Sequence, residues 1–96
     1  MNRDTRKQIL TTMAFYNKKG IPFRAKQMKR LMMILEDIFE HEAYLGEQLN
    51  RIGRKQIIGY WKRTQHESKQ TRKEKYAILE LFCNTAQLAG KVPKPH

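Results

Sequence analysis

Apolar residues recur every three or four positions along most of the chain, which is the spacing of one face of an α-helix. The pattern predicts four helices, over residues 4–19, 24–45, 54–65 and 68–90. Pro22 separates the first two helices, because proline lacks an N–H and biases the residue before it away from the helical region. Gly46 and Gly53 interrupt the pattern before the third helix. Four helices with short joints predict an all-α fold, a compact bundle of four helices.

Start and stop signals bound these predicted helices. Asp4 is expected to cap the first helix, and Gly20 is expected to end it. Ser68 or Thr71 is expected to cap the last helix, with Glu74 completing a capping box with Thr71. Glycine at position 90 is expected to end that helix.

The apolar positions of the periodic segments define the expected core. A tryptophan at core spacing is favoured as a packing residue over a base-stacking one, and the methionine run is favoured as core filling over a peptide-binding surface. The expected interior positions are Ile9, Leu10, Met13, Ala14 and Tyr16; Ala25, Met28, Leu31, Met32, Leu35, Ile38, Phe39 and Leu45; Leu49 and Ile52; Ile57, Ile58, Trp61 and Thr64; and Tyr76, Leu79, Phe82, Cys83, Ala86 and Ala89.

The charged residues fall into three blocks. The chain of 96 residues carries 20 Lys and Arg against nine Asp and Glu, a formal charge of +11. Residues 1–30 hold nine bases and one acid, residues 31–50 hold five acids and no base, and residues 51–75 hold nine bases and two acids. This balance predicts a partner that carries phosphates, with the acidic block facing away from it. A solvated basic surface is the alternative interpretation.

Signals of membrane, secreted or catalytic proteins are missing from the sequence. No apolar run approaches the roughly 18 residues of a membrane span, and the lone Cys83 cannot form an internal disulfide, so we expect no membrane partner and a reducing, cytoplasmic setting. Histidines at 41, 66 and 96 are scattered, one cysteine excludes a multi-thiolate zinc site, and no glycine-rich phosphate loop is present. We therefore expect no catalytic residues, no cofactor and no metal in these residues.

The basic start of the last predicted helix is the strongest candidate for binding chemistry. Free N–H groups of a first helical turn, a hydroxyl and several cations together form a phosphate-binding end. A glutamine such as Gln70 or Gln56 could pair with adenine if its helix entered a major groove. Cations of residues 4–19 are interpreted as a solvated helix face instead. The candidate DNA-binding residues are Arg54, Lys55, Lys62, Lys69, Gln70, Thr71, Arg72 and Lys75.

Three stretches of the second half resemble a known family. They are R-K-Q-I-I-G-Y-W-K-R-T from Arg54, S-K-Q-T-R-K-E-K-Y-A-I-L-E-L-F from Ser68, and G-K-V-P-K-P from Gly90. A helix ending in a bulky aromatic, a short loop, a Ser-x-x-Thr entry and a last helix before a Gly and Pro linker resemble the N-terminal SAM-like, core-binding domain of tyrosine recombinases, the phage-integrase family. The likeness covers roughly residues 24–95.

The resemblance implies a SAM-like core-binding domain over residues 23–90, an additional basic N-terminal helix over residues 1–22, and a linker start over residues 91–96. It implies binding of double-stranded DNA at a core site during DNA integration and recombination, beside other recombinase protomers, in the bacterial cytoplasm and in association with the nucleoid. The family's catalytic set would lie in a catalytic domain of the same chain beyond His96. The fragment is therefore not expected to be an enzyme, whereas the full-length protein is expected to be a tyrosine recombinase.

Two other functions stay open at this point. The chain could be a free-standing small basic regulator of phage or plasmid origin, binding DNA through its third and fourth helices as a helix-turn-helix variant. It could instead be a protein-interaction module that uses the acidic, methionine-rich helix 24–45. Salt dependence separates these classes, because DNA affinity falls steeply with salt.

Overall fold

The computed structural model describes residues 1–88 and 90–95, and this part of the chain is all-α. Four α-helices are present: α1 (Arg3–Thr12), α2 (Pro22–His41), α3 (Arg54–Arg63) and α4 (Lys69–Thr85). Two short 3-10 turns, η1 (Ala43–Leu45) and η2 (Leu49–Arg51), connect α2 to α3. The predicted fold class of four helices is confirmed at this level.

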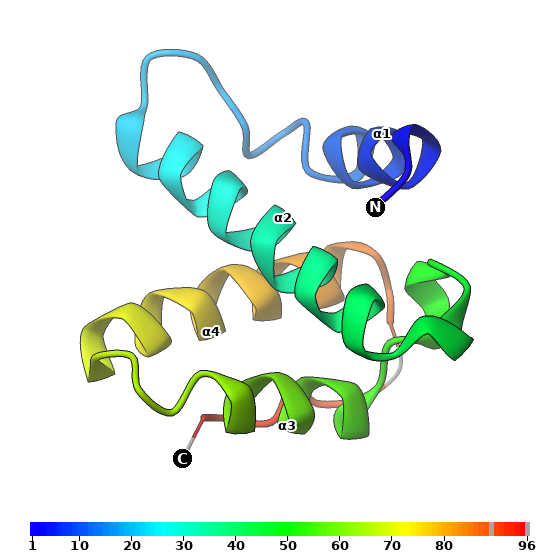
Figure 1. Cartoon of the computed structure of the whole chain (residues 1–96). Helices are drawn as coiled ribbons and strands as arrows, with labels where there is room; N and C mark the ends of the chain where they lie inside the picture. Colours follow the sequence, from blue (N-terminus) through cyan, green and yellow to red (C-terminus); the bar gives the residue numbers. More distant parts are fainter. Residues whose placement is uncertain (89, 96) are drawn as a thin grey trace.

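The longest helix, α2, holds the other helices together. It packs on both α4 and α3, and η1 folds back against it. Figure 1 shows α2 crossing in front of α4, with α3 below both and α1 at the opposite side of the molecule from α3. The assembly measures 33 × 30 × 22 Å along its principal axes. Because α2 is the shared partner, its buried stripe determines the position of every other helix.

The core is formed where the apolar stripes of all four helices meet. From α2, Leu31, Ile34, Leu35 and Ile38 are completely buried, as are Leu79 and Phe82 from α4. The remaining core side chains are Ile9, Met13, Met28, Phe39, Leu45, Ile52, Ile57, Tyr60, Trp61, Ile78, Cys83 and Val92. A period of three to four in the sequence therefore predicts most of the interior.

Several predicted helix ends are wrong. Asn2, not Asp4, caps α1 and accepts a hydrogen bond from the Thr5 N–H at 2.9 Å. This helix ends at Thr12, not at residue 19, and the chain after it turns and then loops through Gly20 in a left-handed conformation (φ +86°). The polar run at residues 17–20 offers little apolar surface to bury, so packing does not extend the helix.

The second and fourth helices also end earlier than predicted. Helix α2 starts at Pro22, with proline in the first turn, and ends at His41, so that Leu45 is buried from η1 instead. Helix α4 ends at Thr85, and Gln87, with φ of 56°, takes the left-handed turn that was expected of Gly90. Because Gln87 is not a glycine, the sequence carried no signal that α4 ends at Thr85.

Some predicted core positions lie at the surface. Leu10, Ala14 and Ala25 are exposed, and Ile58 and Tyr76 are only half-buried. The buried face of α4 instead runs through Arg72, Lys75, Ile78, Leu79, Phe82 and Cys83. The prediction for Ala89 lies outside the described residues. Polar residues on the inward face of α4 were not anticipated, because charged side chains are rarely buried without a partner.

Phe82 tests the assignment of the core. Its side chain is 0% exposed in the centre of the bundle. Phe82→Ala is expected to lower the free energy of unfolding by about 3–5 kcal/mol, because it removes buried surface and leaves a cavity. Phe15→Ala, at a position 53% exposed, is the matched control and should change stability by less than about 0.5 kcal/mol. Urea unfolding followed by circular dichroism measures both, and equal stability of the two variants would contradict the core assignment.

Candidate nucleic-acid interface

The cations at the start of α4 separate into a buried pair and an exposed group. Helix spacing places Arg72 and Lys75 on the same face as Leu79 and Phe82, so both turn inward. Only 9% of Arg72 and 6% of Lys75 is exposed. Lys69, Gln70 and Lys73 are exposed on the other face of the helix, and Thr71 is half-buried.

Arg72 packs against the tryptophan of α3. Its guanidinium carbon lies 5.8 Å from the centre of the Trp61 ring, and its Nη2 donates to the Trp61 carbonyl oxygen at 3.0 Å. Guanidinium groups interact favourably with the face of an indole ring, more so when water is excluded. This contact joins α4 to the last turn of α3.

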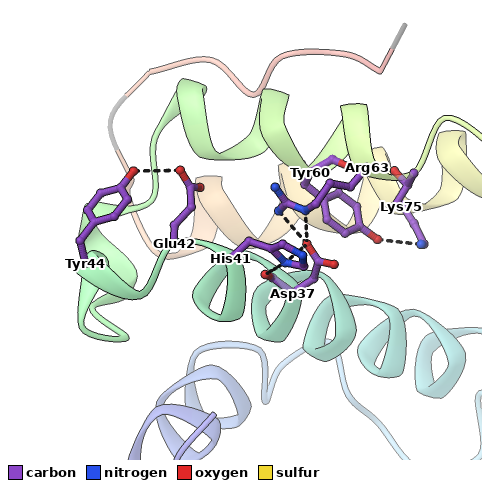
Figure 2. A network of polar contacts seen from close by, with 8 residues as sticks. Asp37, His41, Glu42, Tyr44, Tyr60, Arg63 and Lys75 are labelled. Carbon is purple, nitrogen blue, oxygen red and sulfur yellow. Dashed lines mark hydrogen bonds and ion pairs between the residues drawn. The ribbon is translucent and has the colours of Figure 1, made fainter.

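Lys75 forms a second buried link between the same helices. Its Nζ donates to the Tyr60 hydroxyl at 2.7 Å and to the two carboxylate oxygens of Glu67 at 2.7 and 2.8 Å. Figure 2 shows Tyr60 on α3 directed at Lys75 on α4. Burial alone would lower the pKa of Lys75, but hydrogen bonds with Glu67 and Tyr60 outweigh burial, and the pKa lies above its ordinary value. Burial also raises the pKa of Tyr60.

These contacts correct the expectation that Arg72 and Lys75 present their charges to DNA. Contacts with α3 hold both side chains, and Glu67 also holds Lys75, so little of either side chain is exposed. Reversing either charge would bury an acid beside an aromatic ring, and its first effect would be loss of stability. We therefore remove both residues from the candidate interface.

The predicted capping box of α4 is also wrong. Ser68 caps the helix and accepts from the Thr71 N–H at 3.2 Å, so the alternative cap at Ser68 is confirmed. Glu74 pairs instead with Arg30 of α2, at 2.8 Å between Oε2 and Nη1. This acid is therefore neutralised within the fold, and it does not face the exposed cations of α4 as an unpaired charge.

The last described residues lie along α3. The indole N–H of Trp61 donates to the Pro93 carbonyl oxygen at 2.9 Å, and both Val92 and Pro93 are buried. Figure 1 shows this segment passing along α3. Residues 91–96 were predicted to start a linker, and that prediction did not include the positions of Lys91 and Lys94 beside α3. The apolar Val92, which lies between these two lysines in the sequence, was the available signal that the segment packs on the core.

Exposed cations from three segments meet around α3. Arg54 and Lys91 line one small hollow, and Lys69, Lys73 and Lys94 line another of about 610 Å³. A third hollow, at Lys62, shares Gln65 and Arg72 with the second. We call this surface the α3–tail face; its exposed cations are Arg54, Lys55, Lys62, Lys69, Lys73, Lys91 and Lys94. The sequence contains no acid in residues 51–66 or 84–96, and Glu67, which lines the 610 Å³ hollow, is paired with Lys75, so the exposed lysines and arginines determine the charge of this surface.

Acidic side chains of α2 are engaged within the fold. Asp37 accepts from Arg63 Nη2 at 2.7 Å and from Nε at 2.9 Å, as Figure 2 shows. Glu36 pairs with Arg6 of α1 at 3.1 Å. Gly59 leaves room for the Arg63 guanidinium, since a Cβ at position 59 would lie 3.3 Å from Nη1. Two acids of this block, Glu36 and Asp37, thus bind bases of α1 and α3.

Comparison of the chain with known protein families, curated proteins and solved structures finds no match. Within residues 1–88 and 90–95, no helix has the length and apolar character needed to cross a membrane. The same residues contain no group of three or more His, Cys, Asp and Glu side chains placed to hold a metal ion. The α3–tail face is therefore assessed on its own geometry and charge.

The Lys75 cluster predicts how stability changes with pH. A raised pKa means that folding favours the protonated ammonium, so this contribution is complete below the ordinary lysine value of 10.5 and is lost as pH rises through the folded pKa. Lys75→Met should lower the free energy of unfolding by about 1.5–3 kcal/mol at neutral pH. The difference from wild type should shrink above about pH 10.5. Urea unfolding across this range measures it, and a difference that grows with pH would contradict the assignment.

Proposed function

We propose that this chain binds double-stranded DNA through the α3–tail face. The observation that supports the proposal is the gathering of seven exposed Lys and Arg side chains, from α3, α4 and the segment after α4, on a surface whose own segments are poor in acid. Seven unneutralised cations repel one another, so a surface of this kind is most stable against a polyanion. Duplex DNA supplies closely spaced phosphates along its length.

Contacts of this kind attach the protein to the phosphate backbone, and base reading requires polar groups that reach the groove. Gln56 is already engaged, since its Oε1 accepts from the Gly53 N–H at 2.8 Å and its Nε2 donates to Tyr44. Gln70 is exposed at the start of α4, beside Lys69, and its Nε2 donates a longer hydrogen bond, of 3.4 Å, to Glu74 Oε1. Contacts with the DNA phosphates therefore provide most of the proposed affinity. Of the two glutamines predicted to pair with adenine, Gln70 is the one whose side chain is exposed.

Within DNA binding, we propose the core-binding domain of a tyrosine recombinase as the specific role. The sequence likeness over residues 24–95 supports this proposal, together with the order of helices that leads to a basic end of α4. In this proposal a catalytic domain of the same chain follows His96, and recombinase protomers assemble on DNA in the bacterial cytoplasm. Residues 1–22 add a basic helix whose Arg6 is paired with Glu36 of α2.

A helix-turn-helix regulator is the second candidate, because α3 and α4 are joined by the short segment 64–68 and both contribute exposed cations at that joint. It predicts the same α3–tail contacts, and it differs in needing no catalytic domain. The protein-interaction function of helix 24–45 receives less support. Met28 is buried and Met32 is half-buried, which leaves Met33 as the exposed methionine of that run.

Charge reversal on the α3–tail face tests the proposal. Lys62→Glu combined with Lys94→Glu should weaken binding to a duplex and reduce the slope of log affinity against log salt by about 1 for each lost phosphate contact. Both side chains are exposed, so folding should be retained. Fluorescence anisotropy at several salt concentrations measures the affinity and the slope.

Lys7→Glu on α1 is the control, because it makes the same change in net charge per site at an exposed position away from α3. It should alter duplex binding much less than either α3–tail reversal. Equal losses from the control and from the α3–tail variants would mean that net charge alone, and not this surface, governs binding.

A further inference from the structure

The segment between α1 and α2, together with the first turn of α2, carries large apolar side chains that the core does not use. Phe15 is 53% exposed, Phe23 is 52% exposed and Ile21 is 37% exposed. Figure 1 shows the chain between α1 and α2 as a long loop at the edge of the molecule. We call residues 15–26 the aromatic–basic segment. Aromatic rings left this accessible indicate a binding surface more often than isolated exposed leucines do.

Tyr16 gives this segment a rigid centre. The guanidinium carbon of Arg24 lies 4.9 Å from the centre of the Tyr16 ring, and Arg24 Nη1 donates to the Tyr16 carbonyl oxygen at 3.5 Å. The Phe15 ring meets the Tyr16 ring edge to face, with centroids 6.4 Å apart. The Phe15 and Tyr16 rings therefore have contacts before any ligand binds, which reduces the entropy cost of binding.

A hollow of about 280 Å³ separates this segment from α4. It is lined by the apolar Tyr16, Phe23, Ile78 and Leu81, by Gln70 and Lys73, and by Glu74, whose carboxylate is paired with Arg30. Lys73 also lines the 610 Å³ hollow of the α3–tail face, so the two surfaces adjoin at this lysine. A ligand that has flat apolar faces, polar edges and a negative charge would match the apolar and polar side chains that line this hollow.

Charge complementarity limits the ligand further. The sequence contains no acid between residues 5 and 35, and Lys18, Lys19 and Lys26 of the aromatic–basic segment are exposed. The charge of this segment therefore favours an anionic ligand. Duplex DNA would satisfy the lysines, but its paired bases keep their faces stacked and would leave Phe15 and Phe23 without contacts. Single strands offer every base face to an aromatic ring, together with a phosphate at each step.

We propose that the aromatic–basic segment binds single-stranded DNA, with unpaired bases stacking on Phe15 and Phe23 and phosphates contacting Lys18, Lys19 and Lys26. The inference rests on the proposed DNA-binding function and adds a second surface to it, continuous with the α3–tail face at Lys73. A strand that leaves a duplex bound on the α3–tail face would thus reach the hollow directly. An anionic bilayer matches this surface less well, because amide and ammonium groups line the hollow and its apolar residues lie on two separate elements.

Fluorescence anisotropy with a labelled oligothymidine of about 15 nucleotides, compared with a labelled duplex, tests the proposal in the full chain. Phe15→Leu combined with Phe23→Leu keeps apolar bulk at two exposed positions and removes the rings. This variant should lose about tenfold in single-strand affinity for each ring and keep wild-type duplex affinity. Lys62→Glu with Lys94→Glu should show the reverse preference, losing duplex binding most strongly.

The outcomes separate the two proposals. Unchanged single-strand affinity in the leucine variant, with a wild-type melting curve, would overturn the stacking site and leave duplex binding on the α3–tail face intact. Unchanged duplex affinity in the lysine variant would overturn the proposed function, whatever the leucine variant shows. Binding to phosphatidylserine vesicles that depends on Phe15 and Phe23, with no ring-dependent binding of oligothymidine, would assign the segment to membranes and also overturn the inference.

Discussion

The packing of Arg72 and Lys75 against Trp61 and Tyr60 is the interaction on which the rest of the structure depends. It places two cations of α4 inside the joint between α3 and α4, where Glu67 accepts from Lys75 at 2.7 Å. Taking cations out of water is costly, and the cost is offset here because aromatic faces, a carbonyl oxygen and a carboxylate surround them. Polar contacts therefore join these two helices in addition to the apolar core.

This arrangement divides the basic residues by function. Cations that face inward or pair with acid, such as Arg63 with Asp37 and Arg30 with Glu74, stabilise helix contacts. Seven of the exposed cations lie on α3, the start of α4 and the segment that packs on Trp61, and they form the α3–tail face, whereas the other exposed cations lie in residues 1–30 and at Arg51. The same tryptophan thus contacts the structural cation Arg72 and holds Pro93, which brings Lys94 to the surface. Trp61 therefore contributes to the core and also positions a segment of the proposed interface.

Periodicity predicted the fold class, the four helices and most of the core, because burial of one helix face leaves a direct trace in the sequence. Helix ends were less predictable, since Asn2 and Gln87 act where Asp4 and Gly90 carried the usual signals. In the candidate site, exposure was predicted correctly for Arg54, Lys55, Lys62, Lys69 and Gln70. Arg72 and Lys75 were misplaced because their partners Trp61, Tyr60 and Glu67 come from other elements, and charge patterns along one helix do not show such contacts.

The cations of α3 and α4 form two sets, a structural set inside the fold and an outward set that we propose meets DNA. Acetylation of lysines in the native protein, mapped by mass spectrometry with and without duplex DNA, tests this division. Lys75 should stay unreactive in both states, whereas Lys55, Lys62, Lys69 and Lys94 should react in the free protein and be protected by DNA. Ready acetylation of Lys75 in the folded chain, or protection by DNA that spares all four outward lysines, would contradict it.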